Sequence, residues 1–179
     1  MGDSITEFWR VADPIFFHEK TLDRGISGQT SSQITLRFYT DVVQLHPLAV
    51  HLLVGTNDVA QNTGPISDED FLSNIRTMVD LAQINHIKVV LASIAPAKTF
   101  PWRPNISSPA DRITRLNAQL RLLAKERKLM FVDYYSILTD GQGGLRDALS
   151  NDGVHPNRDG YALMRPVAEK AIAAALHTR

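Results

Sequence analysis

The sequence contains no cysteine, so disulfides, thiolate metal sites and cysteine nucleophiles are all excluded. It also has no excess of either charge, because 19 Lys and Arg residues balance 19 Asp and Glu residues. This balance gives no sign of electrostatic capture of nucleic acid or of an anionic membrane. No stretch approaches the ~18 consecutive apolar residues of a membrane span. These absences argue against nucleic-acid binding and against a membrane span.

No linker, repeat or low-complexity tract divides the 179 residues, which suffice for one domain with a sizeable core. We therefore predict a single domain over residues 1–179. No signal peptide precedes Gly2. The chain as written would be cytoplasmic, and it would be secreted if an N-terminal segment had been removed.

Three short apolar runs, at residues 48–54, 87–92 and 129–133, are typical of buried parallel strands. Apolar residues spaced three and four apart fill the intervals and predict helices around residues 71–82, 113–124 and 164–176. Ser67 with Asp70 predicts a capping box, and Asn157 predicts an N-cap for the last helix. Strands that alternate with helices indicate an α/β fold with helices on both faces of a parallel sheet.

Ser4 is a candidate nucleophile. It follows Gly2 and Asp3, and the next residues read as the start of a helix. A serine at such a turn exposes its hydroxyl, and its backbone N–H, near a helix N-terminus, can point at an anion. The alternative is that Ser4 merely caps the helix, as serines often do.

His155 is a candidate general base, and Asp152 lies three residues before it. On a turn, this spacing lets the carboxylate reach one imidazole nitrogen while the other nitrogen faces the serine. The alternative is ordinary turn chemistry ahead of a helix. A serine, a histidine and a carboxylate together are the components of a serine hydrolase.

Asn57 and Gly28 are candidate hydrogen-bond donors to an anion. Asn57 lies in Gly55-Thr56-Asn57-Asp58, directly after a predicted strand, and ligands bind outside the carboxyl ends of parallel strands. The tetrahedral intermediate of acyl transfer needs N–H donors aimed at its oxygen. A glycine at position 28 lets the backbone approach a ligand closely. Each of these segments alone would also fit a plain turn or loop.

Residues 96–109 contain four prolines and predict a stiff, irregular loop at the same edge of the sheet. Phe100 and Trp102 in this loop are candidates for substrate contact. The alternative is a structural loop whose tryptophan packs on the body of the protein. No His, Asp and Glu cluster has convincing metal-ligand spacing, and no glycine-rich phosphate loop is present.

The combination resembles the SGNH hydrolases, also called the GDSL esterase/lipase family. Members of this family carry Gly-Asp-Ser early, a glycine block, Gly-x-Asn-Asp, and Asp-x-x-His near the end. All four blocks occur here in that order and span nearly the whole chain: Gly2-Asp3-Ser4, Gly25-Ile26-Ser27-Gly28, Gly55-Thr56-Asn57-Asp58 and Asp152-Gly153-Val154-His155.

The resemblance implies a role for each matching residue. Ser4 would be the nucleophile, His155 the base and Asp152 its orienter. The oxyanion hole would consist of the backbone N–H groups of Ser4 and Gly28 and the side chain of Asn57, with Asp3 and Asp58 in supporting positions. The resemblance also implies a three-layer α/β/α sandwich, flavodoxin-like, with a small parallel sheet, and no metal or organic cofactor.

One departure concerns the first strand of the family fold, which precedes Gly-Asp-Ser and delivers the serine to the edge of the sheet. Here only Met1 precedes Gly2, so we expect that strand to be lacking. Losing a central strand exposes the backbone groups and core faces of its neighbours. We expect this form to be less stable than one with the strand restored, and a homo-oligomer is one way to cover the exposed edge.

The expected function is that of a serine ester hydrolase working through an acyl-enzyme. Because the sequence shows no long apolar lid, short acyl chains are preferred, such as acetyl esters of carbohydrates or small alcohols. The alternatives are a lipase or thioesterase for longer acyl chains, an acyltransferase to an alcohol acceptor, and a non-catalytic ester- or glycan-binding module that retains the pocket.

Overall fold

The computed structural model describes residues 1–17 and 20–177. Its centre is a parallel sheet with the strand order β1-β2-β3, where β1 is Ala49–Leu52, β2 is Lys88–Ala92 and β3 is Met130–Val132. In the register, Ala49 lies opposite Lys88, and Val90 lies opposite Met130. The three predicted strands are therefore confirmed, each somewhat shorter than the apolar run that predicted it.

Helices connect and flank the strands. The α-helices in the described part of the chain are α1 (Ser4–Ala12), α2 (Ser31–Asp41), α3 (Thr56–Val59), α4 (Asp68–Ile84), α5 (Pro109–Glu126), α6 (Tyr134–Leu138) and α7 (Arg158–His177), with short 3-10 turns at Val43–Leu45 and Asp147–Leu149. None of these helices combines the length and the apolar character needed to cross a membrane.

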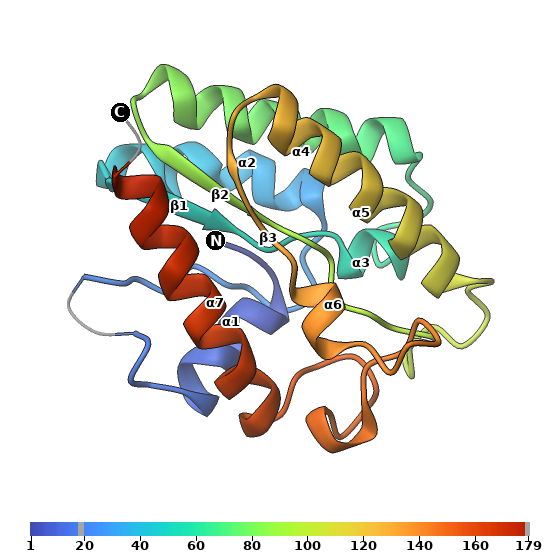
Figure 1. Ribbon diagram of the computed structural model, residues 1–179. Coiled ribbons are helices and arrows are strands. Elements are labelled where there is room, and N and C mark those ends of the chain that lie inside the picture. Colours follow the sequence, from blue (N-terminus) through green and yellow to red (C-terminus); the bar gives the residue numbers. More distant parts are fainter. Residues whose placement is uncertain (18–19, 178–179) are drawn as a thin grey trace.

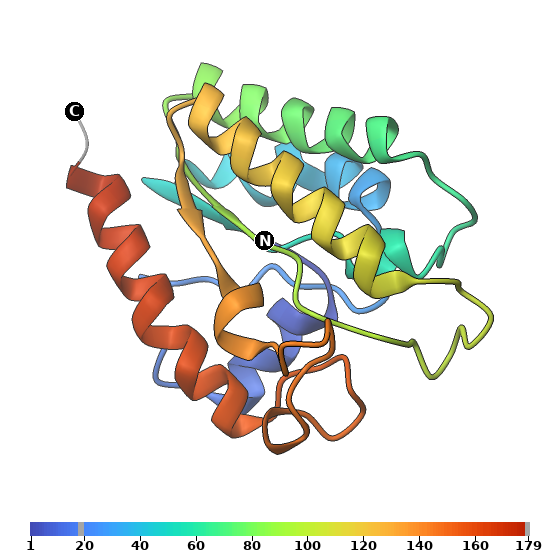
Figure 2. The same cartoon turned by 45° about the vertical axis from the view of Figure 1, so that its right-hand side comes forward.

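The helices form a layer on each face of the sheet. Helices α2, α4 and α5 lie over one face, and α7, with α1 and α6, lies over the other (Figures 1 and 2). The alternation along β2 gives the reason: Val89 and Leu91 belong to the first core, whereas Val90 belongs to the second. Both faces of the sheet are apolar and both are covered, which confirms the predicted three-layer α/β fold.

The two predicted N-caps form as hydrogen bonds, although the capping box at Ser67 forms only in part, because Asp70 accepts from the Ser67 hydroxyl and not from its backbone N–H. The Ser67 hydroxyl accepts from the backbone N–H of Asp70 over 3.0 Å at the start of α4. The side chain of Asn157 accepts from the backbone N–H groups of Asp159 and Gly160 at the start of α7. These bonds satisfy N–H groups that have no partner inside a helix, and so they fix where the two helices begin.

Met1 and Gly2 lie beside the end of β1, in the position expected for the end of a further parallel strand. The N–H of Leu53 donates to the Met1 carbonyl over 3.2 Å, and the N–H of Ile26 donates to the Gly2 carbonyl over 3.1 Å. Gly2 forms parallel bridges with Leu53 and Gly25. A Cβ at Gly2 would lie only 2.4 Å from the Leu53 carbonyl oxygen, so glycine is needed here.

The sheet of the described residues has no complete strand on this side of β1. A cavity of about 300 Å³ lies there, with Met1, Trp9, Phe16 and Val50 among its lining residues. The Met1 amino group lies at its edge and donates to the His51 carbonyl over 2.9 Å. Burial lowers the pKa of this amino group to about 5, so at neutral pH it is largely uncharged.

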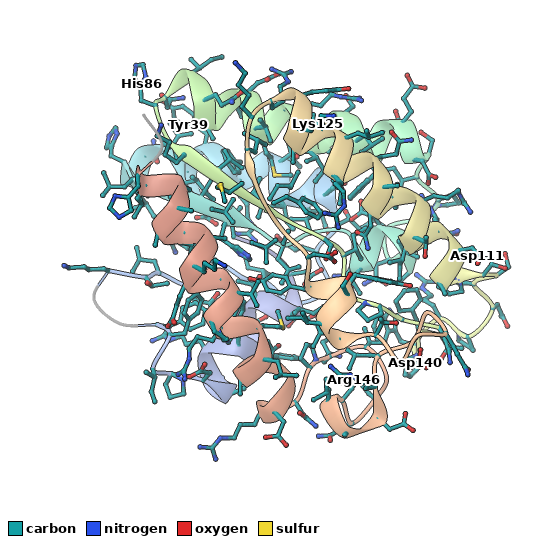
Figure 3. The ribbon with its side chains drawn as sticks, viewed as in Figure 1. Tyr39, His86, Asp111, Lys125, Asp140 and Arg146 are labelled. Carbon is teal, nitrogen blue, oxygen red and sulfur yellow. The ribbon has the colours of Figure 1, made fainter. Side chains whose placement is uncertain are left out.

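The carboxyl ends of the strands point to one end of the molecule, where α1 and α3 begin and the loops after β2 and α6 run. Figure 3 shows Asp111 and Asp140 at this end, whereas His86, which precedes β2, lies at the opposite end. Lys98 in the loop after β2 pairs with Asp140 in the loop after α6 over 2.6 Å. The two loops therefore lie side by side at the edge where ligands bind in such sheets.

We predict that a short extension of alternating Val and Ile before Met1 raises the thermal stability. The added residues would pair with the open side of β1, fill part of the cavity, and replace a buried amine with an uncharged amide. Because 1 kcal/mol shifts the midpoint of a domain of this size by roughly 2–4 °C, we expect a rise of at least about 3 °C. A Gly/Ser extension of equal length is the control, and equal melting temperatures for the two extensions would contradict the prediction.

Candidate active site

Ser4 is the first residue of α1, and the residue before it caps the helix. The Asp3 carboxylate accepts from the backbone N–H of Ile5 over 3.0 Å. The interpretation of Ser4 as the cap is therefore wrong, because Asp3 already fills that role. The Ser4 hydroxyl is left free of capping and lies 2.9 Å from His155 Nε2.

His155 links the serine to a carboxylate. Its Nδ1 lies 2.6 Å from Asp152 Oδ2, on the opposite side of the ring from the contact with Ser4. With Nδ1 protonated and bonded to a carboxylate, Nε2 carries the lone pair that accepts the serine proton. Hydroxyl, imidazole and carboxylate thus stand in one hydrogen-bonded series, which can move a proton away from the hydroxyl.

The turn that carries Asp152 holds the carboxylate in its ionised form. Burial by itself would raise the pKa of Asp152, but hydrogen bonds from the backbone N–H of His155, its ring and the N–H of Val154 outweigh burial and lower it. The Ser150 hydroxyl donates to the His155 carbonyl over 2.7 Å and so closes the turn. Asp152 is therefore a carboxylate at neutral pH and can stabilise an imidazolium beside it.

Asn57 follows β1 by way of Gly55, whose φ of 130° and close contact with the Ile94 side chain exclude a residue with a Cβ. The side chain of Asn57 is almost fully buried in α3. Its Nδ2 donates one hydrogen bond to the Gln29 carbonyl over 3.0 Å. An amide nitrogen carries two hydrogens, so one N–H of Asn57 remains for another acceptor.

Gly28 lies in the exposed loop between Gly25 and the start of α2, with a φ of 79°. Glu7 of α1 ties this loop to the helix of the serine, because its carboxylate accepts from both the N–H and the hydroxyl of Ser27. Among the described residues, no acceptor is bonded to the backbone N–H of Gly28 or of Ser4. Both groups are free to donate to a ligand.

Asp3 and Asp58, the neighbours of Ser4 and Asn57 in sequence, are both buried. Asp58 accepts from the backbone N–H and the hydroxyl of Ser31 at the start of α2, and so joins α3 to α2. Burial raises the pKa of Asp3 to about 7 although the bond from Ile5 opposes it, and burial raises the pKa of Asp58 to about 6 against the bonds from Ser31. Each carboxylate anchors the start of a helix.

Two exposed aromatic rings flank the histidine. The ring of Phe8 lies 5.2 Å from that of His155 between centroids, and the ring of Trp102 lies 5.9 Å from it. Phe100 is fully buried in the core and contacts Trp102, with 5.4 Å between ring centroids. Of the two aromatic residues predicted for substrate contact, Trp102 is therefore beside the histidine, whereas Phe100 lies beneath Trp102.

Phe8 and Asn62 were not predicted from the sequence to belong to the site. Phe8 is four residues after Ser4, and this spacing in a helix places two side chains on one face. Asn62 donates to Asn57 Oδ1 over 2.7 Å and accepts from Trp102 Nε1 over 2.8 Å. Its place in a polar turn after α3 carries no sequence signal, since Asn and Gly are common in turns.

Comparison with known proteins gives consistent matches. Residues 1–163 match the GDSL-like lipase/acylhydrolase family. The crystal structure of a GDSL-like lipase from Bacteroides thetaiotaomicron VPI-5482 superposes with a TM-score of 0.96 and 44% sequence identity, covering 98% of this chain and 86% of that one.

Two curated proteins are also similar. The isoamyl acetate-hydrolyzing esterase of Saccharomyces cerevisiae is 26% identical over 96% of this chain and 83% of its own length. YqeF, an uncharacterized lipoprotein of Bacillus subtilis, is 32% identical over 42% of this chain, and the match spans only 32% of that protein. With a family match over most of its length and the near-identical fold of the Bacteroides lipase, the chain belongs to the GDSL-like lipase/acylhydrolase family of carboxylic ester hydrolases.

Proposed function

We propose that the chain hydrolyses short-chain acyl esters through an acyl-enzyme on Ser4, with His155 as general base and Asp152 as the orienter of the base. The observation that carries the proposal is the series of hydrogen bonds from the Ser4 hydroxyl to His155 Nε2 over 2.9 Å and from His155 Nδ1 to Asp152 over 2.6 Å. Nucleophile and base are within hydrogen-bond reach, and a third group orients the base, as covalent catalysis by serine requires.

In the acylation step, the Ser4 oxygen attacks the ester carbonyl carbon while its proton passes to His155 Nε2. The imidazolium formed is stabilised by the Asp152 carboxylate. When the tetrahedral intermediate collapses, the bond to the alcohol oxygen breaks and His155 returns the proton to that oxygen. Deacylation repeats the sequence with water as the nucleophile, which releases the acid and restores the serine.

The negative charge on the carbonyl oxygen needs donors that are in place before the reaction. The free N–H groups of Ser4 and Gly28 and the second N–H of Asn57 supply them in the proposal. Support comes from three sides: Asn57 is buried and fixed by Gln29, Gly28 is tied to α1 through Ser27 and Glu7, and Ser4 opens a helix whose dipole favours an anion.

The proposed acyl group is short, and the proposed alcohol is a carbohydrate or a small alcohol. Phe8 and Trp102 are each about two-fifths exposed and offer flat apolar faces beside His155, suited to a small alkyl group or a sugar ring. The similarity to an esterase named for isoamyl acetate points in the same direction. Lipase or thioesterase activity on longer chains is the rival that a substrate series separates from this proposal.

We predict that a serine-directed fluorophosphonate labels the wild-type protein with one adduct per chain, read by intact mass, because His155 activates the Ser4 hydroxyl. Ser4→Ala should lose the label, and its ester hydrolysis should fall at least about 10³-fold. Thr6→Ala, two residues further along the same helix, is the matched control and should still be labelled. A folded wild-type protein that takes no label would instead favour a binding module without turnover.

We predict that kcat/KM for p-nitrophenyl esters is highest for acetyl to butyryl and declines with longer chains. The methylenes of a longer acyl chain would extend beyond the flat aromatic faces into water. They would therefore gain little transfer free energy. The measurement is a series of initial rates at one pH over increasing acyl length, with Ser4→Ala as the background. A rate that climbs steadily to long chains would contradict the short-chain assignment and favour a lipase.

Asp3 gives a prediction for stability against pH. In the unfolded chain its carboxyl ionises near 3.8, whereas burial keeps its proton until about pH 7 in the fold. Between these values the folded state holds more protons, so the contribution of Asp3 to stability is lost as pH rises. Asp3→Asn keeps the cap and removes the titration, so the stability of this variant relative to wild type should grow by roughly 1–3 kcal/mol over this pH range.

The measurement is urea unfolding of the wild type and Asp3→Asn across the window between those two pKa values. Asp111→Asn is the control, because Asp111 is an exposed residue in the first turn of another helix, α5. A difference between Asp3→Asn and wild type that stays constant with pH would refute the assignment of a buried, proton-binding carboxyl to Asp3.

A further inference from the structure

Asn62 lies in the turn after α3 and joins three parts of the site. Its side-chain nitrogen donates to Asn57 Oδ1 over 2.7 Å and to the Gly28 carbonyl over 3.2 Å. Its side-chain oxygen accepts from the indole N–H of Trp102 over 2.8 Å. One half-buried amide thus contacts the proposed oxyanion donor, the glycine loop and the exposed tryptophan.

The indole N–H of Trp102 determines how the side-chain amides of Asn62 and Asn57 are oriented. The nitrogen of a tryptophan ring can only donate, so the atom of Asn62 that faces Trp102 must be its oxygen. The Asn62 nitrogen then faces Asn57, which must present its own oxygen in turn. The Asn57 nitrogen is left on the other side, with one N–H on the Gln29 carbonyl and one for a ligand.

The turn itself holds Asn62 from both sides. Its backbone N–H donates to the Asn57 carbonyl over 3.0 Å, and the preceding Gln61 has a left-handed φ of 55° that directs the chain back toward α3. The Arg103 guanidinium donates to the Asn62 carbonyl over 3.3 Å from the loop after β2. Asn62 is therefore fixed relative to Asn57 and to the loop that carries Trp102.

We propose that Asn62 is a positioning residue that keeps the free N–H of Asn57 aimed at the substrate oxygen and connects it to Trp102. This inference rests on the proposed function, because it assumes that Asn57 stabilises the oxyanion. No hydrogen bond joins Asn62 to Ser4 or His155. Its effect on turnover passes through the orientation of Asn57 and of the indole.

The first test is Asn62→Asp, which keeps the shape of the side chain and removes both of its donated hydrogen bonds. A carboxylate can only accept, so the amide of Asn57 would turn its nitrogen toward residue 62 and its oxygen toward the substrate oxygen. We expect kcat for p-nitrophenyl acetate to fall by roughly 10²-fold, close to the roughly 10²–10³-fold expected for Asn57→Ala, while KM changes less than about threefold.

Asn105→Asp is the matched control. Asn105 is exposed in the same loop as Trp102 and has no side-chain hydrogen bond within the described residues. Asn105→Asp therefore adds one negative charge without changing the hydrogen bonds among Trp102, Asn62 and Asn57. We expect the rate of Asn105→Asp to stay within about twofold of wild type. Equal rates for Asn62→Asp and Asn105→Asp would overturn the proposal.

A double-mutant cycle with Asn62→Ala and Asn57→Ala separates positioning from a general structural role. If Asn62 acts through Asn57, its removal should lower kcat about tenfold in the wild type and much less once Asn57 is already alanine. Additive losses in the double mutant would contradict the proposal, as would a loss explained by a lower melting temperature. Because the cycle uses alanine variants, it also tests the positioning role of Asn62 if Asn62→Asp does not fold.

The outcome distinguishes this inference from the proposed function. If wild-type hydrolysis does not depend on Ser4, the proposed function fails and the assumption behind the role of Asn62 fails with it. If hydrolysis depends on Ser4 and on Asn57 but is unchanged in both Asn62 variants, the proposed function stands and the positioning role is refuted.

Discussion

The hydrogen bond between Ser4 and His155 is the interaction on which the rest of the site depends, and it joins the two ends of the domain in sequence. It forms because the residues on either side are fixed by separate means. Gly2 is paired between Leu53 and Gly25, which delivers Ser4 to the start of α1, and the Asp152 turn holds His155 before α7. The parallel sheet brings these segments together, since its strands all end at the same edge.

Two carboxyl groups close to this bond in sequence, those of Asp152 and Asp3, have pKa values shifted in opposite directions. Asp152 receives three hydrogen bonds from Val154 and His155, which keep its pKa low. Asp3, also close to the nucleophile in sequence, is buried deeply enough that its pKa rises to about 7. Hydrogen bonding at Asp152 and burial at Asp3 therefore give two similar side chains opposite pKa shifts: Asp152 bonds to the His155 ring, and Asp3 caps a helix. The same reasoning applies to Asn57, whose burial and fixed partners set the direction of a donor in advance of any substrate.

Much of this arrangement could be predicted from the sequence. The apolar runs predicted the strands, the helical periodicity and the caps predicted the helices, and four short segments predicted the candidate site residues, of which Ser4, His155 and Asp152 are joined by hydrogen bonds. The N-cap of α1 could not be predicted from the sequence, because Asp3 and Ser4 are both good N-cap residues and only the backbone conformation decides between them. Whether Phe100 and Trp102 are buried or exposed depends on how an irregular loop packs. The proposed role of Asn62 depends on a contact with Trp102, 40 residues away in sequence. Such long-range amide contacts leave no local pattern.

The central claim, a covalent acyl-enzyme on Ser4, is tested most directly by trapping that intermediate. The protein is mixed with p-nitrophenyl acetate, quenched with acid within the first turnovers, digested and mapped by mass spectrometry. The account predicts an acetyl group on the peptide that contains Ser4, formed in step with a burst of p-nitrophenol and increased in amount when deacylation is slowed. Ester turnover with no acetyl group on Ser4, or with the acetyl group on another side chain, would contradict it.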